Sequence, residues 1–210
     1  MEDKITRKIN LDENDGLSAF LGMHAQQSHN AFLVFYEFIK KVKPVRILEI
    51  GTALGGFTQF LKWVSDDINH PMNILSYDIH EHDWYKEMIN NGIDIRIENV
   101  FSNTYDSVES SVINFIQNDG VTVVLCDGGY KIGEFNILSK YIKPGDFIMA
   151  HDYSENKEIF ESKINRKIWN WFEISNEDII QSCIDNNLIV YEKETFEDVV
   201  WTCRKKIITT

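Results

Sequence analysis

Apolar residues gather in five short runs, and stretches of helical spacing separate these runs along the chain. The runs cover residues 46–50, 73–79, 93–100, 121–126 and 147–150. Runs of this length are typical of parallel strands that are buried on both faces. Between them, apolar residues recur every three or four positions, as in amphipathic helices, at 57–64, 106–117 and 133–141. This alternation predicts an α/β fold with a Rossmann-like, doubly wound and mostly parallel sheet.

The two ends of the chain add further elements to this core. The first ten residues are polar and are expected to be loose, whereas the spacing from Gly16 to Val42 predicts one helix with a row of phenylalanines. Near the other end, residues 188–191 and 199–203 predict an antiparallel strand pair joined by an acidic turn. This pair supplies a C-terminal antiparallel strand to the predicted sheet.

Residues 154–171 are polar and charged, with aromatic residues at intervals, and are too long for a bare loop. We expect them to form a mobile helical lid over the strand ends. Ser175 and Asp178 have the form of a capping box, which predicts a helix to about Asn186. We expect one domain over residues 1–210, with an N-terminal helical cap (1–43), a core (44–152), a lid (153–174) and a C-terminal helix and strand pair (175–210).

The composition excludes several classes of protein. Of the 210 residues, 43% are hydrophobic, and no uncharged apolar stretch reaches the roughly 18 residues of a membrane helix. A formal net charge of -12 argues against nucleic acid as a partner, because phosphate binding needs a basic face. The first eight residues lack an apolar signal core, and the three cysteines form no CxxC pair. We expect a soluble, cytoplasmic protein with reduced cysteines and no membrane partner.

Acidic residues stand at or directly after the ends of four predicted strands, namely Glu49, Asp78, Asp127 and Asp152. Open α/β sheets bind ligands outside the carboxyl ends of their strands, so we expect these acids to converge. The strands that precede Asp127 and Asp152 should be neighbours in a doubly wound sheet. Two facing carboxylates at that distance require a cation or a proton between them.

The turn after the first strand reads Glu49-Ile50-Gly51-Thr52-Ala53-Leu54-Gly55-Gly56. Its glycines allow a ligand to approach the backbone before the next helix begins. The spacing is GxxxGG and differs from the GxGxxG pattern of dinucleotide-binding proteins. Glu49 lies in a buried strand, where a carboxylate is costly unless it meets donors or a cation. The turn therefore predicts a ligand-binding loop.

These residues make the chain resemble the class I S-adenosylmethionine-dependent methyltransferases over about residues 44–155. In that family an acid, one spacer and Gly-x-x-x-Gly follow the first strand, and a second acid ends the second strand. The resemblance implies S-adenosylmethionine as the cofactor, bound by residues 44–152. It assigns the methionine end to Glu49, Gly51, Thr52, Gly55 and Gly56, the ribose to Asp78, and the adenine to Phe101 and Ser102.

Asp127-Gly128-Gly129-Tyr130 and the segment from Lys143 to Asp152 resemble a subgroup of that family, the macrolide-sugar O-methyltransferases and cephalosporin-hydroxylase-like proteins. The resemblance implies a divalent metal at Asp127, His151 and Asp152, with Asp127 also touching the cofactor. Oxygen ligands favour magnesium or manganese, whereas His151, which replaces an acid, favours manganese, iron or zinc. In the alternative, Asp127 contacts only the cofactor and Asp152 caps the following helix.

Methyl transfer to oxygen usually needs a general base. The subgroup carries a His three residues after the fourth-strand Asp, where this chain has Tyr130. Lys131 and His151 are the other candidates for the base.

Two aromatic and two amide side chains are further candidates for the site. Trp169 and Trp171 either stack on a substrate ring or pack in the core. Gln26 and Gln27 either reach the methionine part of the cofactor or form an exposed turn.

We expect this chain to methylate a hydroxyl group of a small molecule or sugar, with S-adenosylmethionine as donor and with metal assistance. One alternative is transfer to nitrogen or to a macromolecule, although the chain lacks the Asn-Pro-Pro-Tyr motif of amino-methylating DNA enzymes. Another is a cofactor-binding module without turnover. The phenylalanine-rich helix is expected to face either the sheet or a sister subunit of a homo-oligomer.

Overall fold

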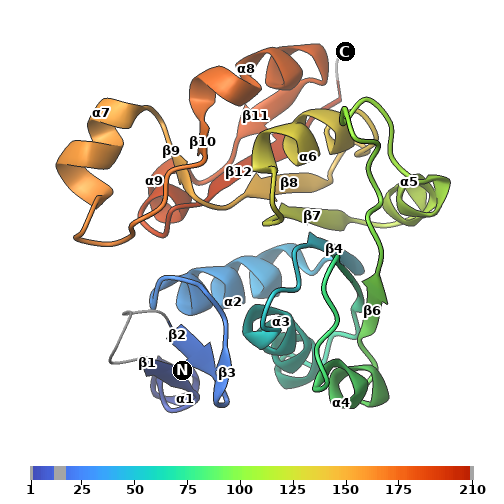
Figure 1. Ribbon diagram of the computed structural model, residues 1–210, viewed down its shortest axis with the longest axis vertical. Helices are drawn as coiled ribbons and strands as arrows, with labels where there is room; N and C mark the ends of the chain where they lie inside the picture. Colours follow the sequence, from blue (N-terminus) through green and yellow to red (C-terminus); the bar gives the residue numbers. More distant parts are fainter. Residues whose placement is uncertain (1, 12–17, 209–210) are drawn as a thin grey trace.

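A computed structural model describes residues 2–11 and 18–208, and a seven-stranded sheet forms its centre (Figure 1). In spatial order its strands are β11 (Leu188–Val190), β12 (Thr202–Lys206), β8 (Phe147–Ala150), β7 (Thr122–Cys126), β4 (Arg46–Ile50), β5 (Asn73–Asp78) and β6 (Asp94–Ile97). The strands from β8 to β6 are parallel, and β12 pairs antiparallel with both β8 and β11. The predicted Rossmann-like sheet with an antiparallel C-terminal strand is confirmed.

Helices cover both faces of this sheet (Figure 1). One face carries α2 (Ala31–Val42), α3 (Gly56–Asp67), α4 (Tyr85–Asn90) and α9 (Lys193–Glu197), and the other carries α5 (Ser110–Gln117), α6 (Lys131–Leu138) and α8 (Asn176–Asp185). Successive strand residues point to opposite faces, so Val123 and Leu125 enter one core while Val124 and Cys126 enter the other. This burial on both faces explains the uninterrupted apolar runs in the sequence.

The phenylalanines of α2 face the sheet. The ring of Phe38 packs edge-on against Phe147 of β8, with centroids 5.2 Å apart, and Phe35 packs against Trp201 at 5.1 Å. The aromatic row is therefore part of the core of this chain and needs no second copy to bury it.

The helix predicted from Gly16 to Val42 is wrong before residue 31. The described part of residues 18–24 forms a hairpin of β2 (Ser18–Phe20) and β3 (Met23–His24). Leu21 and Gly22 have φ angles of 53° and 83°, and two left-handed residues in succession make a tight antiparallel turn. Gly22 is the residue that indicates a turn here, although the apolar spacing also fits a helix. Gly16 and Leu17 lie outside the described residues.

The first ten residues also differ from the expected loose segment. Residues from Glu2 to Thr6 form helix α1, and β1 (Ile9–Leu11) pairs antiparallel with β2. The side chain of Ile5 is buried in the core with the α2 aromatics. Ile9 is buried in the same core, so two apolar side chains anchor a segment whose composition is otherwise polar.

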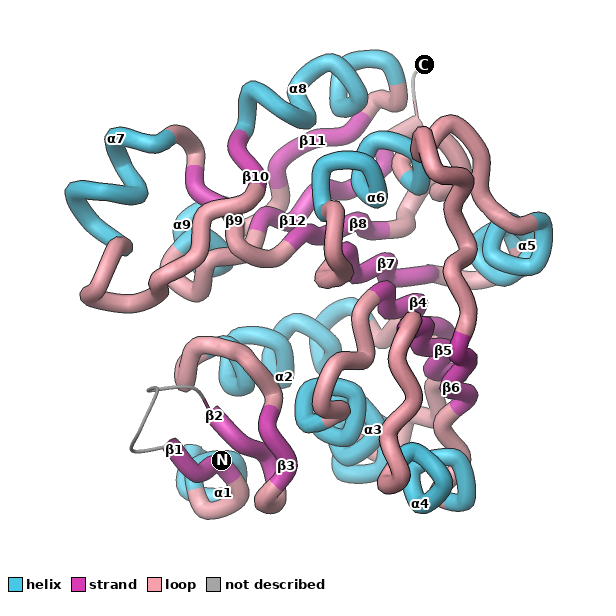
Figure 2. Tube along the Cα trace, in the orientation of Figure 1, coloured by secondary structure: helices cyan, strands magenta, loops and turns pink. Residues whose placement is uncertain are grey.

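The segment predicted as a helical lid over residues 154–171 is helical over residues 157–164 and otherwise mostly loop (Figure 2). Its ends pair as two short parallel strands, β9 (Tyr153–Ser154) and β10 (Ile174–Ser175). Between them lie helix α7 (Lys157–Ile159) and a π-helical turn (Phe160–Ile164). The predicted capping box of Ser175 and Asp178 at the start of α8 is confirmed.

At the carboxyl end, the expected acidic turn is instead helix α9, and the last strand starts three residues later than predicted. The cause is Phe196, which is fully buried and packs against Phe38 with ring centroids 5.3 Å apart. A helical turn brings this side chain to the core, whereas an open loop would leave it in water.

The described residues, 2–11 and 18–208, contain no helix with the length and apolar character needed to cross a membrane. Cys126, Cys183 and Cys203 are all buried and free of disulfides.

Candidate functional site

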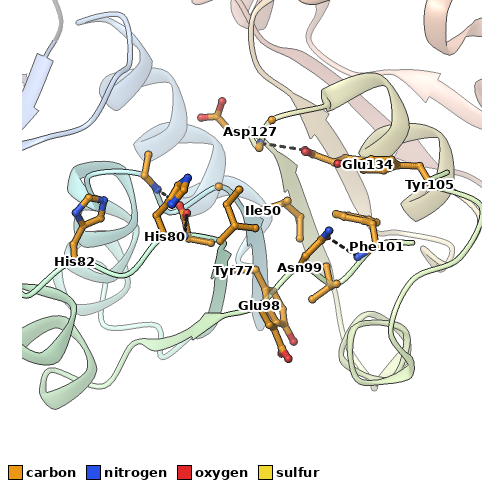
Figure 3. Close-up of a pocket in the computed structure, with 17 residues that line it drawn as sticks. Ile50, Tyr77, His80, His82, Glu98, Asn99, Phe101, Tyr105, Asp127 and Glu134 are labelled. Atoms are coloured by element: carbon orange, nitrogen blue, oxygen red, sulfur yellow. Dashed lines mark hydrogen bonds between the residues drawn. The ribbon is translucent and has the colours of Figure 1, made fainter. Parts of the chain in front are cut away.

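A cavity of about 410 Å³ opens at the carboxyl ends of β4, β5 and β7 (Figure 3). The turn after β4 and the loop after β6 complete its wall. Its polar and aromatic lining consists of Tyr77, Asp78, His80, His82, Glu98, Asn99, Phe101, Tyr105, Asp127 and Glu134. The sheet thus places its ligand-sized cavity at the edge that the acids predicted.

Asp78, at the end of β5, holds the glycine turn in position. Its carboxylate accepts hydrogen bonds from the backbone N–H of Ala53 at 2.6 Å and from that of His80 at 2.9 Å. Ala53 has a φ of 47°, a left-handed conformation that few residues other than glycine adopt. Asp78 also lines the cavity, so one carboxylate shapes the loop and faces the ligand space.

The glycines of the turn after β4 allow neighbouring segments of the chain to pack closely. A side chain on Gly51 would meet the carbonyl oxygen of Asp127 at 2.3 Å, and one on Gly56 would meet that of Met23 at 2.3 Å. A side chain on Gly55 would meet the side-chain sulfur of Met88 at 2.8 Å. Of these three, only Gly51 lines a cavity, so the structure places Gly55 and Gly56 behind the wall.

Glu49 lies behind this wall as well. Its carboxylate is 2% exposed and accepts hydrogen bonds from the hydroxyls of Ser76 at 2.5 Å and Thr58 at 2.6 Å. Burial raises the pKa of Glu49 to about 7, although both hydroxyl donors act to lower it. The side chain links β4, β5 and α3, and lines neither of the two cavities of the site.

Replacing Glu49 with glutamine should flatten the dependence of stability on pH. The pKa is 4.5 without the protein environment and about 7 in the folded chain, so the folded state binds the proton more tightly. Stability therefore falls as pH rises from 4.5 to 7, by about 3 kcal/mol for this group. Urea unfolding at pH 5 and pH 8 should show a smaller difference for Glu49→Gln than for the parent. An equal difference in both proteins would mean that Glu49 does not titrate in this range.

Of the two residues predicted at the adenine, the structure brings only Phe101 to the cavity. Tyr105 stacks on Phe101, with ring centroids 4.9 Å apart, and adds a second aromatic wall that the sequence reasoning missed. Ser102 instead donates a hydrogen bond to Asp106 at 2.8 Å and accepts one from its backbone N–H, which closes a local turn. Ser102 does not line the cavity.

A second cavity, of about 340 Å³, adjoins the first and shares Gly51, Ala53, Asp127 and Gly128 with it. Its other lining residues are Ala25, Gln26, Thr52, Phe57, Lys131, His151, Asp152, Trp169, Trp171 and Glu173. The predicted lid therefore contributes both of its tryptophans to this space. Two compartments joined along the glycine turn suit a ligand with two ends.

Asp127, His151 and Asp152 meet in the second cavity, with one ligand atom of each lying within 4.8 Å of the others. The meeting follows from the adjacent parallel pairing of β7 and β8. Asp152 has a φ of 56°, a left-handed conformation that Asp tolerates better than most residues. Of the four acids expected to converge, Asp127 and Asp152 therefore meet here, while Asp78 lines the first cavity and Glu49 lines neither. The roles of Asp127, His151 and Asp152 stay predictions.

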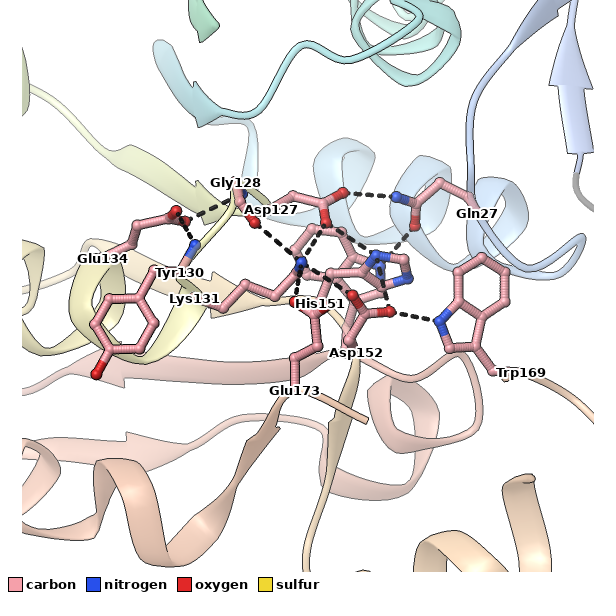
Figure 4. Close-up of polar contacts among 11 residues, drawn as sticks. Gln27, Asp127, Gly128, Tyr130, Lys131, Glu134, His151, Asp152, Trp169 and Glu173 are labelled. Carbon is pink, nitrogen blue, oxygen red and sulfur yellow. Dashed lines mark hydrogen bonds and ion pairs between the residues drawn. The ribbon is translucent and has the colours of Figure 1, made fainter. Parts of the chain in front are cut away.

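The ammonium of Lys131 lies within this cluster (Figure 4). Its Nζ is 2.9 Å from Asp152 Oδ2, 2.8 Å from Glu173 Oε2 and 3.7 Å from Asp127 Oδ1. Burial alone would lower the pKa of Lys131, but the carboxylates of Asp127 and Asp152 outweigh it and raise the pKa above its ordinary value. Lys131 is thus a charged partner of acids in the resting protein, which disfavours its predicted role as base.

Tyr130, another candidate for the general base, points away from the cluster of Asp127, His151 and Asp152 (Figure 4). Its side chain is 48% exposed, packs edge-on against Tyr105 and lines neither cavity. The backbone N–H of Tyr130 and that of Gly128 both donate to the buried carboxylate of Glu134, each at 3.1 Å. Glu134, which the sequence reasoning did not single out, fixes the turn between Asp127 and Lys131.

Gln27 and two tryptophans complete the cluster. An indole N–H can only donate, so Trp201 Nε1 fixes Gln27 Oε1 as its acceptor at 2.8 Å. Gln27 Nε2 then donates to Asp127 Oδ2 at 2.9 Å. Trp169 Nε1 donates to Asp152 Oδ1. Gln27 is thus buried and bonded to the cluster, so it is not part of an exposed turn, and it lines neither cavity, whereas Gln26 lines the second.

His151 is the member of the cluster with a free ring nitrogen. Its Nδ1 lies 3.0 Å from Asp127 Oδ1, and its Nε2 is buried without a hydrogen-bond partner among the described residues. The ring stacks on Trp201, with centroids 4.8 Å apart. Burial alone would lower the pKa of His151, but Asp127 and Asp152 outweigh it and raise the pKa.

The side chains present do not fit a divalent metal in this arrangement. Each of the four carboxylate oxygens of Asp127 and Asp152 already has a partner, from Gln27, His151, Trp169 or Lys131. A metal would have to displace these contacts and lie beside an ammonium that carries like charge. The oxygen-rich donor set that magnesium needs is therefore already engaged.

Comparison with known proteins adds a family match to this geometry. Residues 16–202 match the family model described as rhamnosyl O-methyltransferase/CmcI. The Mg-SAM form of CmcI has a TM-score of 0.61 and 10% sequence identity, and the match covers 93% of this chain and 80% of that one. The SAH form of CmcI has a TM-score of 0.58 and 10% identity, with 95% of this chain and 87% of that one covered.

An O-methyltransferase family protein from Burkholderia thailandensis matches with a TM-score of 0.55 and 10% identity, over 86% of this chain and 56% of that one. At these identities the structural matches show the fold. None of the curated proteins matches this chain.

Proposed function

Because this chain belongs to the rhamnosyl O-methyltransferase/CmcI family, we propose that it transfers a methyl group from S-adenosylmethionine to a hydroxyl group of a small molecule or sugar. The observation that carries the proposal is the pair of adjoining cavities joined by Gly51, Ala53, Asp127 and Gly128. The first suits the nucleoside end of a cofactor, and the second suits the acceptor.

In this arrangement adenosine occupies the first cavity, with its ribose hydroxyls on Asp78 and its base between the ring of Phe101 and the turn after β7. A carboxylate is the group that accepts two hydroxyl hydrogen bonds at once. The methionine part runs along Gly51 and Thr52, which places the sulfonium methyl at the mouth of the second cavity. CmcI structures with SAH and with Mg-SAM on the same fold support S-adenosylmethionine as the cofactor.

The transfer needs alignment and one proton acceptor. The acceptor oxygen attacks the methyl carbon, the carbon–sulfur bond breaks, and the sulfonium becomes a neutral thioether. His151 is the base that the geometry favours, because Nδ1–H donating to Asp127 leaves a lone pair on Nε2 to take the hydroxyl proton. Since the carboxylates raise the pKa of His151, we expect the methylation rate to increase toward mildly alkaline pH.

Metal assistance, which the resemblance implied, has no step in this mechanism because the oxygens of Asp127 and Asp152 are already engaged.

The acceptor cavity carries Asp127, Asp152 and Glu173 beside the indole rings of Trp169 and Trp171. Carboxylates repel phosphates, and indole rings bind the apolar faces of sugars and aromatic compounds. These residues favour a neutral or cationic small molecule over nucleic acid.

Calorimetric titration with S-adenosylmethionine and with its demethylated product tests the cofactor assignment. We expect micromolar binding of both in the presence of EDTA. Formation of the demethylated product with panels of sugar, phenol and amine acceptors then tests the reaction, and turnover should be confined to hydroxyl acceptors. Absence of cofactor binding would remove the proposal, and turnover with amines alone would change the acceptor to nitrogen.

A further inference from the structure

We propose that Lys131 is the resident cation of the acceptor site, and that its ammonium takes the place of a divalent metal between Asp127 and Asp152. Nζ of Lys131 is within hydrogen-bond distance of Asp152 and Glu173, and it lies 3.7 Å from Asp127. The site therefore has a positive charge at the point where its acids converge.

Every N–H of this ammonium has a protein acceptor. They are the Gly128 carbonyl at 3.1 Å, Asp152 Oδ2 at 2.9 Å and Glu173 Oε2 at 2.8 Å. The side chain of Lys131 is only 6% exposed. An ammonium with three satisfied donors in a buried position resembles a fixed structural cation more than a mobile surface lysine.

The position of Lys131 in the fold is unfavourable for its positive charge. Lys131 is the first residue of α6, and a positive charge at the amino end of a helix opposes the helix dipole. Glu134 fixes the turn that separates Asp127 from Lys131 by accepting two backbone hydrogen bonds. The three carboxylates offset the unfavourable position of the ammonium, so its placement is explained by the cluster rather than by helix stability.

The chemistry of His151 also fits a site that holds an ammonium. A neutral imidazole neighbouring Asp127 is a poorer ligand for magnesium than a carboxylate, whereas it is compatible with a site that already holds a cation. Removal of the acceptor proton then falls to a side chain of the protein. This last consequence rests on the proposed function, while the cation assignment does not.

Manganese binding to the full-length protein tests the assignment. Protein freed of metal with EDTA and dialysed is titrated with Mn²⁺ while the electron paramagnetic resonance signal of free Mn²⁺ is recorded. We expect no site of micromolar affinity in the parent protein. Lys131→Met should create one, with affinity at least tenfold above the parent, and adding Asp152→Asn to it should remove that site again.

Two controls separate charge from disturbance of the fold. Lys131→Arg keeps the positive charge and should remain without a manganese site, and Lys140→Met removes an exposed lysine just beyond α6 and should behave like the parent. If circular dichroism shows that Lys131→Met is unfolded, Lys131→Gln, which keeps a polar chain of similar length, takes its place.

A parent protein that binds one Mn²⁺, and loses it in Asp152→Asn, would overturn the assignment. So would folded Lys131→Met and Lys131→Gln variants that bind no manganese. Affinity for the demethylated cofactor is measured in parallel. Its absence in the parent would count against the proposed function and leave the manganese result to decide the cation assignment by itself.

Discussion

Replacing Gly51 with alanine should lower the thermal midpoint of unfolding by roughly 10 °C and abolish binding of the demethylated cofactor. Gly51 has a φ of 95°, and an added Cβ would lie 2.3 Å from the carbonyl oxygen of Asp127. Strain at this φ and overpacking against rigid backbone sum to about 4 kcal/mol. For a domain of this size each kcal/mol corresponds to roughly 2–4 °C. Calorimetric melting and titration measure both effects.

Gly145→Ala is the matched control for this substitution. Gly145 has nearly the same φ, 94°, but an added Cβ there meets nothing within 4 Å. It should show the strain of the left-handed backbone alone, about 1 to 2 kcal/mol, and leave cofactor affinity unchanged. Equal losses in the two variants would mean that the close approach of Gly51 to the turn after β7 is unimportant.

Replacing Asp78 with alanine should weaken binding of the demethylated cofactor about 100-fold. The carboxylate is the proposed acceptor for two ribose hydroxyls and also holds the backbone N–H of Ala53. Hydrogen bonds to a charged group contribute about 1.5–3 kcal/mol each, so losing them lowers affinity by at least two orders of magnitude. Calorimetric titration measures the change.

Two further variants show which of these roles dominates. Asp78→Asn keeps an acceptor for the Ala53 N–H but removes the charge, so an affinity close to the parent would assign Asp78 to the loop rather than to the ribose. Asp66→Ala removes an acid on the solvent side of α3 and should leave affinity unchanged. Parent-like affinity in Asp78→Ala itself would remove Asp78 from the cofactor site.

The sheet was predictable because it is buried on both faces. Residues such as Val123 and Val124 must both be apolar when each faces a different core, and the resulting runs mark the strands directly. The same regularity placed Asp127 and His151 at adjacent strand ends. The positions of residues at the ends of parallel strands therefore determine much of the site, and this part of the site can be predicted from sequence alone.

What sequence could not show is the direction in which a side chain points. Ser102 and Glu49 stand at the positions that the resemblance assigned to ligands, yet Ser102 donates to the carboxylate of Asp106 and Glu49 accepts from the hydroxyl of Thr58. Lys131 was proposed as a base, but the fold brings its ammonium into contact with acids from three segments of the chain. The hairpin at residues 18–24 was missed because its apolar spacing also fits a helix, and only Gly22 argued against that.

The hydrogen bonds from Trp201 to Gln27 and from Gln27 to Asp127 tie the acceptor cavity to distant parts of the chain. The cofactor cavity is lined by residues 50–134, which form one continuous stretch. The acceptor cavity instead needs residues 25–26 and 151–173 together, and its support needs Trp201, 174 positions from Gln27. We therefore expect a change at position 27 or 201 to disturb the acceptor cavity more than the cofactor cavity, so that the choice of acceptor can be altered by residues that line neither cavity.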